Sequence, residues 1–415
     1  MFWFGKKEEV IVSLDIGTEF VKAILISRDG RNGHVLGAGL KRQSLGEMKS
    51  GVVMDLGEVV DNSEEAIERA FKNTRNHDIS GVILGMAGES VKGTVTEVEY
   101  ERTYSEEEIK IEELRNIVQK LQWDSFSKAR REIAQEIGSP EIDVKLVSSG
   151  IVSAKIDGVR VSNPLGFVGK KVVLSVFTSF APLLFHQALR SVVNSLRLPL
   201  LDIVATPYAI SSSLSFESGD DGDVIFIDVG GGTTDIAITK YGGIIGQKSF
   251  TMGGRTFTKN IMDNLNLSFN EAEKVKIEYS NGKLVSESEK LTKKILKSSS
   301  EIWIEGVKMA LEEFETELLP KKIVLCGGGS LLPEVKERLS DEAWISEMNF
   351  SSEPKIRFAQ TNEITNIVDD FEKIDSSQYV VCLALGSLAV RESDENNSFL
   401  EKIWQGAFKK FNFRA

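Results

Sequence analysis

The sequence predicts an α/β protein built from two related lobes. Short apolar runs typical of β-strands alternate with segments of helical period along most of the chain, which favours this class. A short pattern also occurs in both halves: an apolar strand, an Asp, an apolar residue and a Gly, followed by a second strand. Its copies are residues 14–18 and 227–231. Two copies in separate halves indicate a duplicated lobe.

Length and charge narrow the class further. With 415 residues the chain is too long for one small core, and we expect two or more domains. The formal net charge of -12 argues against general nucleic-acid binding, which needs a basic surface. Cys326 and Cys382 each lie in an apolar run and are expected to be buried thiols in a reducing compartment.

The sequence predicts neither a membrane-crossing helix nor a signal peptide. No apolar run reaches the roughly 20 residues that cross a bilayer. At the start of the chain, basic residues follow the short apolar stretch of residues 2–4 instead of preceding it. We therefore expect a cytoplasmic protein.

The first half is expected to hold one lobe and an insertion. Strands are predicted at residues 10–18, 20–26, 35–40 and 82–84, and a helix is predicted to begin near Ser63. The segment from residue 85 to 165 is rich in Glu and Lys and is interpreted as an inserted subdomain. It is expected to contain helices at 106–122 and 126–137 and strands at 144–147 and 151–156. A buried strand at 172–177 and a helix at 183–196 follow.

The second half is predicted to repeat the order of strands around an Asp-Gly turn. A polar stretch at residues 211–222 is interpreted as a surface loop or lobe boundary. A strand then leads into the second Asp-Gly turn, and a further strand is predicted at 236–239. Helices are predicted across 260–318, followed by a strand at 323–325 and a helix that begins near Pro333.

The first Asp-Gly turn has the residues of a phosphate site. Gly17 permits close approach of the backbone to a phosphate, and the hydroxyl of Thr18 can donate to it. Asp15, at the end of its strand, can hold Mg²⁺ through water, and Lys22 on the returning strand can reach a phosphate. Taken alone, the same residues also fit an ordinary tight turn.

The second turn is more specific. Asp228 takes the place of the first Asp as a Mg²⁺ ligand, and three consecutive glycines follow, which a simple hairpin does not need. The expected phosphate contacts are Gly230, Gly231, Gly232, Thr233 and Thr234. A third cluster joins a strand to a helix, and beside the first two it is interpreted as an adenosine-facing loop. It consists of Gly327, Gly328, Gly329 and Ser330.

These three clusters, in this order, resemble the actin-like ATPase superfamily, and within it the FtsA family of bacterial cell-division proteins. The resemblance spans nearly the whole chain and is strongest at residues 228–237; residues 163–169 also resemble the exit from the family's inserted subdomain. It implies duplicated actin-like (ribonuclease H-like) lobes with an inserted FtsA-type subdomain. It also implies adenosine contacts from Glu273 and Lys276; Gly253 and Gly254 complete the expected nucleotide-binding residues.

Three features depart from the family pattern. Asn163 stands where an Asp is expected, and the inserted subdomain has extra helix after Trp123, which leaves its partner surface open. At the position where relatives that hydrolyse ATP place a Glu or Gln before a proline, this chain has Thr206. Its hydroxyl is too short to orient the attacking water well. Thr206 is thus a weak candidate catalytic residue, and slow hydrolysis is expected.

The end of the chain is predicted to be an amphipathic membrane helix. On a helical projection of residues 399–415, large apolar side chains share one face and basic side chains are in excess. This pattern suits an anionic membrane surface, although a helix packed on its own domain is the alternative. The residues expected at the membrane are Phe399, Leu400, Lys402, Ile403, Trp404, Phe408, Lys409 and Phe411.

The resemblance implies a cell-division protein that binds ATP and Mg²⁺ and polymerises at the inner face of the cytoplasmic membrane. Its expected partners are FtsZ, through the helical subdomain; further copies of itself; the membrane, through the terminal helix; and later divisome proteins, through the inserted subdomain. A PilM-like adaptor of pilus assembly is the first alternative, and the terminal helix argues against it. A small-molecule kinase is the second, but no catalytic Asp beside a substrate site can be placed.

The expected domains follow from these assignments. They are residues 1–84 and 166–215 for the core of the first lobe, 85–165 for the inserted subdomain, 222–244 and 321–368 for the core of the second lobe, 245–320 for its helical subdomain, 369–390 for a return to the first lobe, 391–398 for a linker and 399–415 for the amphipathic helix.

Overall fold

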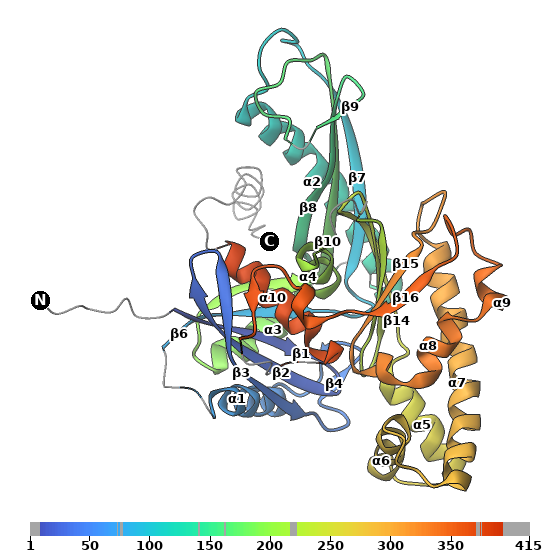
Figure 1. Ribbon diagram of the computed structural model, residues 1–415. Coiled ribbons are helices and arrows are strands. Elements are labelled where there is room, and N and C mark those ends of the chain that lie inside the picture. The colour runs from blue at the N-terminus through green and yellow to red at the C-terminus, as the bar shows by residue number, and fades with distance from the viewer. Residues whose placement is uncertain are drawn as a thin grey trace, which may run out of the picture.

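A computed structural model describes residues 9–392, apart from residues 73, 75–77, 140–141, 162, 216–221, 371–373 and 375. The predicted membrane helix, residues 393–398 of the predicted linker and the apolar start of the chain lie outside these residues. Residues 391 and 392, which were predicted to begin the linker, are instead helical. Figure 1 shows two α/β lobes side by side, with the inserted segment rising above them.

The first lobe is built on a six-stranded sheet with the order β11-β6-β1-β2-β3-β17. The strands are β1 (Val10–Ile16), β2 (Phe20–Asp29), β3 (Asn32–Arg42), β6 (Ile79–Met86), β11 (Leu200–Ala205) and β17 (Ile367–Val368). β1 is antiparallel to β2 and parallel to β6. A short hairpin of β4 (Met48–Lys49) and β5 (Val52–Val53) follows β3. The predicted α/β class is therefore confirmed for this lobe.

Helices cover both faces of this sheet. Side chains of α1 (Leu56–Phe71) and α3 (Leu183–Ser195) share a core with one face of β1, through residues such as Val12 and Leu14. Side chains of α4 (Thr206–Ser213) and α10 (Val380–Glu392) share a core with the other face, through Ile11 and Ile24. Alternate residues of the strands thus point into different cores, as the pleat requires.

The second lobe repeats the strand plan of the first. Its strands are β12 (Val224–Val229), β13 (Thr234–Lys240), β14 (Gly243–Phe250), β15 (Lys322–Cys326) and β16 (Lys355–Phe358). β12 is antiparallel to β13 and parallel to β15, just as β1 is antiparallel to β2 and parallel to β6. This equivalence supports the duplication that the repeated Asp-Gly pattern predicts.

Helices fill the rest of the second lobe and lie at the lower right of Figure 1. They are α5 (Gly254–Leu265), α6 (Phe269–Ser280), α7 (Ser286–Glu312), the 3-10 turn η1 (Gly328–Leu331), α8 (Pro333–Leu339) and α9 (Glu342–Ile345). Their apolar side chains, led by the fully buried Trp303, pack on one face of the sheet. Two further 3-10 turns are η2 (Thr361–Glu363) and η3 (Ser377–Tyr379).

The inserted segment forms a sheet with one long helix on it. It contains β7 (Lys92–Glu101), α2 (Ile111–Ile137), β8 (Val144–Ile156), β9 (Val159–Val161) and β10 (Lys171–Pro182). The chain enters this segment from β6 and leaves it into α3, both in the first lobe. Its sheet nevertheless joins that of the second lobe, because Gln247 of β14 pairs with Gly93 of β7. The insertion therefore contacts both lobes.

One hydrophobic core runs between the lobes. It combines Ile24 and Ile26 of the first sheet with Val224 and Phe226 of the second, and α4 and α10 contribute to it. The two predicted buried cysteines are confirmed, because Cys326 and Cys382 are both fully buried thiols within this core.

Several predicted elements are corrected by the structure. The first helix begins at Leu56, with Asp55 as its N-cap, and not near Ser63. Ser63 is buried within this helix and donates a hydrogen bond to the carbonyl of Val59. The helices predicted at 106–122 and 126–137 are the single helix α2, which ends where Gly138 adopts a left-handed conformation.

The polar stretch predicted as a loop from residue 211 is helical at its start. Ser211 and Ser213 belong to α4 and are buried. Their hydroxyls donate to the carbonyls of Tyr208 and Ala384, at 3.0 and 3.1 Å, so they do not need solvent. The strand β7 and the helix α10 were not predicted from the sequence.

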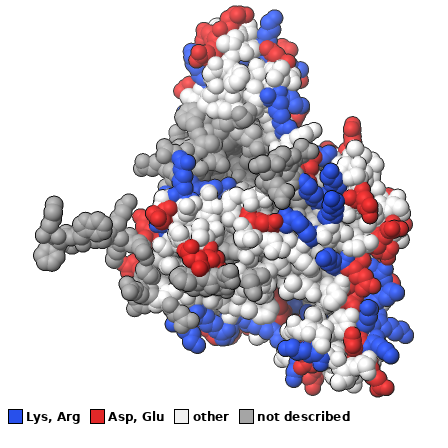
Figure 2. Space-filling view, viewed as in Figure 1, with Lys and Arg blue, Asp and Glu red and all other residues white. Residues whose placement is uncertain are grey.

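On the face shown in Figure 2, acidic and basic side chains are interspersed. Among the described residues, no helix has both the length and the apolar character that crossing a bilayer requires.

Candidate functional site

The first hairpin presents Asp15 and Lys22 at one end of the first sheet. The two residues pair across β1 and β2, and the ammonium of Lys22 lies 2.8 Å from a carboxylate oxygen of Asp15. Burial on its own would lower the pKa of Lys22, but Asp15 and the nearby Asp228 outweigh it and raise the pKa. Lys22 therefore stays charged beside two carboxylates.

The second hairpin has the same construction. The N–H of Gly17 donates to the carbonyl of Phe20 at 3.0 Å, and the N–H of Gly230 donates to the carbonyl of Thr233 at 2.9 Å. In each hairpin the Asp lies two residues before this glycine and pairs with the residue seven positions later, Lys22 in the first and Asp235 in the second. The two turns are thus equivalent in detail.

The tips of the two hairpins touch. A β-carbon built on Gly231 would lie 2.6 Å from the β-carbon of Glu19, and one on Gly232 would lie 2.8 Å from the hydroxyl oxygen of Thr18. Only glycine permits this approach, because any larger residue would push the tips apart. The structure therefore brings the first two predicted clusters together, although more than 200 residues separate them.

The turns also leave backbone donors free. In the part of the chain that the structure describes, no acceptor bonds the N–H groups of Thr18, Gly231 or Gly232. Backbone N–H groups of successive turn residues form concave sites that bind anions. The contact between the tips thus has the donor chemistry of an anion site.

Acidic groups lie beside these donors. Burial, together with Asp235 and Asp15, raises the pKa of Asp228 to about 7, although Lys22 acts in the opposite direction. Burial also raises the pKa of Asp235, although hydrogen bonds from the hydroxyl of Thr233 and the backbone of Gly88 oppose it. Asp228 thus lies close to its titration point near neutral pH, where a bound cation would favour its charged form.

The start of α5 is fixed against the second turn. The N–H of Gly254 donates to the carbonyl of Gly230 at 2.8 Å, and Gly253 approaches the same carbonyl closely. On α6, the ammonium of Lys276 lies 2.7 Å from the carboxylate of Glu273 and 3.0 Å from the carbonyl oxygen of Gly254. The predicted adenosine contacts therefore lie together at the edge of the second hairpin.

The third cluster packs on the second hairpin as well. Cys326 pairs with Asp228 across β15 and β12, and Gly327 follows directly. Gly327 has φ +82° and ψ 157°, a region that only glycine populates, and its built β-carbon would lie 2.1 Å from a carboxylate oxygen of Asp228. The hydroxyl of Ser330 donates to the carbonyl of Gly327 at 2.7 Å. Gly329 approaches the carbonyl of Val229, whereas a β-carbon on Gly328 would meet open space.

Besides Thr18, the predicted site contains three threonines, and these differ in position. Thr233 donates to Asp235 at 2.9 Å, beside the second turn. Thr234 faces the core of the second lobe, where its hydroxyl donates to the carbonyl of Met252 and accepts from Trp303. It is therefore not among the side chains at the turns. Thr206 is 2% exposed, and its hydroxyl has no partner among the described residues.

Thr206 nevertheless lies near the first hairpin. A β-carbon built on Gly85 would lie 2.8 Å from the methyl group of Thr206 and 3.9 Å from a carboxylate oxygen of Asp15. The structure thus places the residue predicted to replace the water-orienting Glu or Gln close to the first Asp.

Sequence reasoning missed the residues that connect the two halves of this site. The N–H of Gly88, at the start of the insertion, donates to the carboxylate of Asp235 at 3.1 Å. The guanidinium of Arg255 lies 2.6 Å from the carboxylate of Glu19. Neither pair has a local sequence signal, because the partners lie 147 and 236 positions apart.

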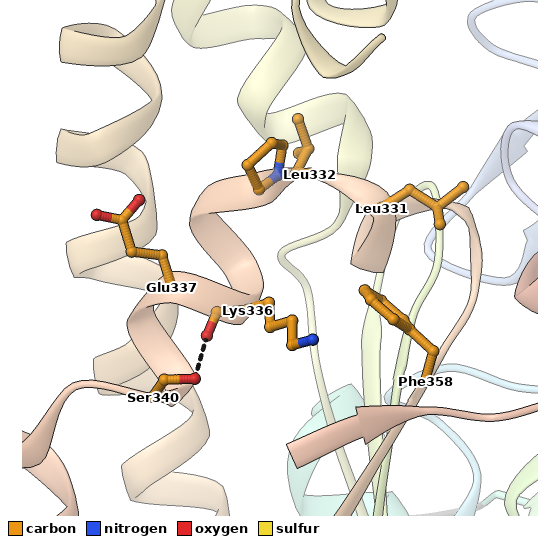
Figure 3. Close-up of a pocket in the computed structure, with 7 residues that line it drawn as sticks. Leu331, Leu332, Lys336, Glu337, Ser340 and Phe358 are labelled. Atoms are coloured by element: carbon orange, nitrogen blue, oxygen red, sulfur yellow. Dashed lines mark hydrogen bonds between the residues drawn. The ribbon is translucent and has the colours of Figure 1, made fainter. Parts of the chain in front are cut away.

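A separate pocket of about 500 Å³ begins one residue after Ser330 (Figure 3). The side chain of Lys336 points toward Phe358, with its ammonium 5.2 Å from the centre of the Phe358 ring. None of the hairpin residues lines this pocket. It is therefore distinct from the anion site.

Comparisons with known proteins agree with this arrangement. A family profile described as "Cell division protein FtsA" matches residues 225–384, which include the second hairpin and the third cluster. "Cell division protein FtsA" of Enterococcus hirae is 24% identical over 355 residues, which are 79% of this chain and 75% of that protein. The same protein of Bacillus subtilis (strain 168) is 26% identical over 272 residues, which are 65% of this chain and 57% of that protein.

Among solved structures, a chain of a "PilM-PilN type IV pilus biogenesis complex" matches with a TM-score of 0.63 and 17% identity. The match covers 93% of this chain and 99% of that one. This likeness shows the fold. The sequence matches show that the chain is similar to the FtsA cell division proteins, and the structural match shows that it shares the α/β fold of the matched chain in the PilM-PilN complex.

Proposed function

We propose that the chain binds ATP between its lobes, with the phosphates held by the two hairpin turns. The observation that supports this most strongly is the set of free N–H groups at Thr18, Gly231 and Gly232, where the tips meet. Phosphate oxygens would accept from these donors, and Lys22 adds a positive charge nearby. Asp15 and Asp228 explain why a metal ion is needed, since two carboxylates would otherwise repel the phosphates.

Mg²⁺ fits these residues. Carboxylate oxygens of Asp15 and Asp228 are the hard donors that Mg²⁺ prefers, and it keeps several of its waters. In the described part of the chain, no group of three or more His, Cys, Asp or Glu side chains could hold a metal ion. The ion would therefore need oxygens of the nucleotide as well. When bound, it would neutralise phosphate charge.

Adenosine would lie between α6 and the third cluster. Glu273 and Lys276 on α6, and Gly327 to Ser330, adjoin the second turn from two elements. Ile277 follows Lys276 and is 45% exposed, and Leu331 follows Ser330 and is 46% exposed. These exposed aliphatic side chains are suited to contact a flat apolar base.

ATP in this chain acts mainly as a structural ligand, and its hydrolysis is slow. Thr206 lies near Asp15, but its side chain is short and enclosed. Phosphate release by the purified full chain should be slow, and lower still in Thr206→Ala. Fast turnover, or phosphate release unchanged by Thr206→Ala, would argue against this role.

The homology to FtsA supports a role as a division scaffold. In this proposal the ATP-bound chain polymerises at the inner face of the cytoplasmic membrane and tethers FtsZ filaments to it. Residues 399–415, outside the described residues, provide the membrane anchor, and the insertion contacts later divisome proteins. The predicted division of the chain into nine segments stays part of this proposal, apart from β10, which pairs with β7 and β8 of the insertion, and residues 391–392, which end α10.

An exposed apolar face on α7 is the proposed contact for FtsZ. Ile302 and Met309 are 64% and 65% exposed and lie two helical turns apart, so they share one face. Large exposed apolar side chains that share a face mark protein contacts. Ile302→Asp should reduce co-sedimentation with FtsZ filaments, whereas the surface variant Lys259→Asp, on α5, should not.

Electron microscopy on lipid monolayers tests the whole proposal. The full chain with Mg·ATP should form filaments on monolayers that contain anionic lipid. Monomers under the same conditions would favour the second candidate, an adaptor like PilM, which the fold similarity supports. That adaptor should form no filaments and should not bind FtsZ.

A further inference from the structure

Arg255 belongs to the second lobe, but its side chain lies against the first. Its Nε donates to the carboxylate of Glu19 at 2.6 Å. Its terminal nitrogens donate to the carbonyls of Gln43 and Ser44, at 3.1 and 3.4 Å, and of Met48 at 3.5 Å. All these partners belong to the first lobe: Glu19 lies in the first hairpin, Gln43 and Ser44 follow β3, and Met48 begins β4.

The backbone of the same residue holds the second hairpin. The N–H of Arg255 donates to the carbonyl of Gly231 at 2.8 Å. Gly231 is the residue whose built β-carbon would collide with Glu19. One residue therefore bonds both hairpins at their point of contact, through its backbone on one side and its side chain on the other.

The ion pair of Arg255 with Glu19 is mostly buried, and Glu19 also pairs with Arg42. The side chains of Arg255 and Glu19 are each 10% exposed, and the second carboxylate oxygen of Glu19 accepts from Arg42 at 2.6 Å. An enclosed ion pair adds little net stability, because desolvation of the charges offsets their attraction. Its effect is instead geometric, since a planar guanidinium accepts partners only in fixed directions.

We propose that Arg255 is a positioning residue that holds the two phosphate-binding turns in register before nucleotide arrives. This inference rests on the proposed function of those turns. A binding site that is already assembled avoids the cost of selecting a rare conformation. If the turns lose their register, only a fraction of the molecules has an assembled site, and the apparent affinity for the nucleotide falls in proportion to that fraction. Neither Arg255 nor Glu19 is among the residues expected to touch ATP.

The first test measures nucleotide affinity. In Arg255→Lys the ammonium can keep the charge but cannot bridge Glu19 and the loop carbonyls together, so the dissociation constant for Mg·ATP should rise on the order of tenfold. Glu19→Gln should act in the same direction. The matched control is Arg338→Lys, which alters a guanidinium whose partners among the described residues are Glu301, Asp341 and Ser300, all in the second lobe.

The second test measures the lobes without nucleotide. The native thiols are buried, so spin labels can be placed selectively at Glu64→Cys on α1 and Lys274→Cys on α6, both exposed positions. The full chain should give one narrow distance distribution with or without Mg·ATP. Arg255→Lys should broaden it only in the absence of nucleotide, and saturating Mg·ATP should restore it.

The outcomes separate this inference from the proposed function. Unchanged distances and affinity in both Arg255→Lys and Glu19→Gln would overturn the positioning role. If Arg255→Lys does not fold, the Mg·ATP affinity and the spin-label distances of Glu19→Gln test the positioning role in its place. If the unaltered chain binds no Mg·ATP, the proposed function fails, and the nucleotide-free distances alone still decide whether Arg255 holds the lobes together.

Discussion

At the residue scale, the surroundings of Asp228 change its chemistry strongly. It pairs with Asp235 across β12 and β13, and burial, together with Asp235 and Asp15, raises its pKa to about 7. Because the raised pKa belongs to the folded state, the protonated form stabilises the fold. This contribution is fully present below the ordinary value of 3.8 and is lost as the pH rises through about 7.

The same titration predicts a pH dependence of nucleotide binding. Mg²⁺ is bound by the carboxylate and not by the acid, so affinity for Mg·ATP should fall from about pH 8 to about pH 6, with an inflection near the pKa of Asp228. Nucleotide titrations at several pH values measure this. Asp228→Asn should bind more weakly and show no such inflection. An inflection that persists in this variant would assign the titration to another group.

At the element scale, α6 carries the predicted adenosine contacts, and its start is fixed by a capping box. The N–H of Ser268 donates to the carboxylate of Glu271 at 2.8 Å, while the N–H of Glu271 donates to the hydroxyl of Ser268 at 3.4 Å. Both bonds satisfy donors that a helix start would otherwise leave free.

Removing this cap should destabilise the lobe. Ser268→Ala should lower the free energy of unfolding by about 1 kcal/mol, because the first turn of α6 loses its acceptor. Urea denaturation measures this free energy of unfolding. Ser280→Ala is the control, since that hydroxyl donates to the carbonyl of Lys276 within the same helix and caps nothing. Equal losses in both variants would show that the capping box contributes nothing of its own.

The elements that sequence predicted well are those with strong local signals. The paired Asp-Gly turns are such elements, because the glycines and carboxylates that the chemistry needs lie within a few consecutive residues. The start of α1 was missed because this helix buries small or polar side chains, among them Asn62, Ser63 and Ala66. It packs so closely on β3 that a β-carbon on Gly39 would lie 1.9 Å from the carbonyl of Ala66.

The parts of the site that sequence could not predict depend on long-range contacts. In the sequence, nothing distinguishes Arg255 from other basic residues, and only the structure shows that Glu19 lies beside it. Similarly, the sequence motif predicts that Thr234 donates to a phosphate, but the strand register places its hydroxyl against Trp303 instead. Register and interlobe contacts come from the folded chain as a whole.

At the scale of the whole molecule, α4 and α10 provide a core shared by the two lobes. The hairpin tips, the pair of Glu19 with Arg255 and the bond between Gly88 and Asp235 add polar contacts between the lobes and to the insertion. The proposed nucleotide site thus lies where these parts meet.

The membrane anchor is predicted to be independent of this site. Deletion of residues 399–415 should abolish pelleting with anionic liposomes, because the apolar and basic face of the tail is lost. Mg·ATP affinity should stay within about twofold, because no residue of the tail is needed at the hairpins. Liposome sedimentation and nucleotide titration measure the two effects. Pelleting that survives the deletion would place the membrane contact elsewhere in the chain.

Calorimetric titration of the full chain with Mg·ATP tests the central claim most directly. We predict one site per chain, weakened on the order of tenfold or more by Gly231→Ala, because the added methyl group separates the hairpin tips. Gly57→Ala, at a helical position with only an ordinary contact at 3.5 Å, should bind like the unaltered chain. Equal affinity in Gly231→Ala, or no binding by the unaltered chain, would contradict a nucleotide site between the two hairpins.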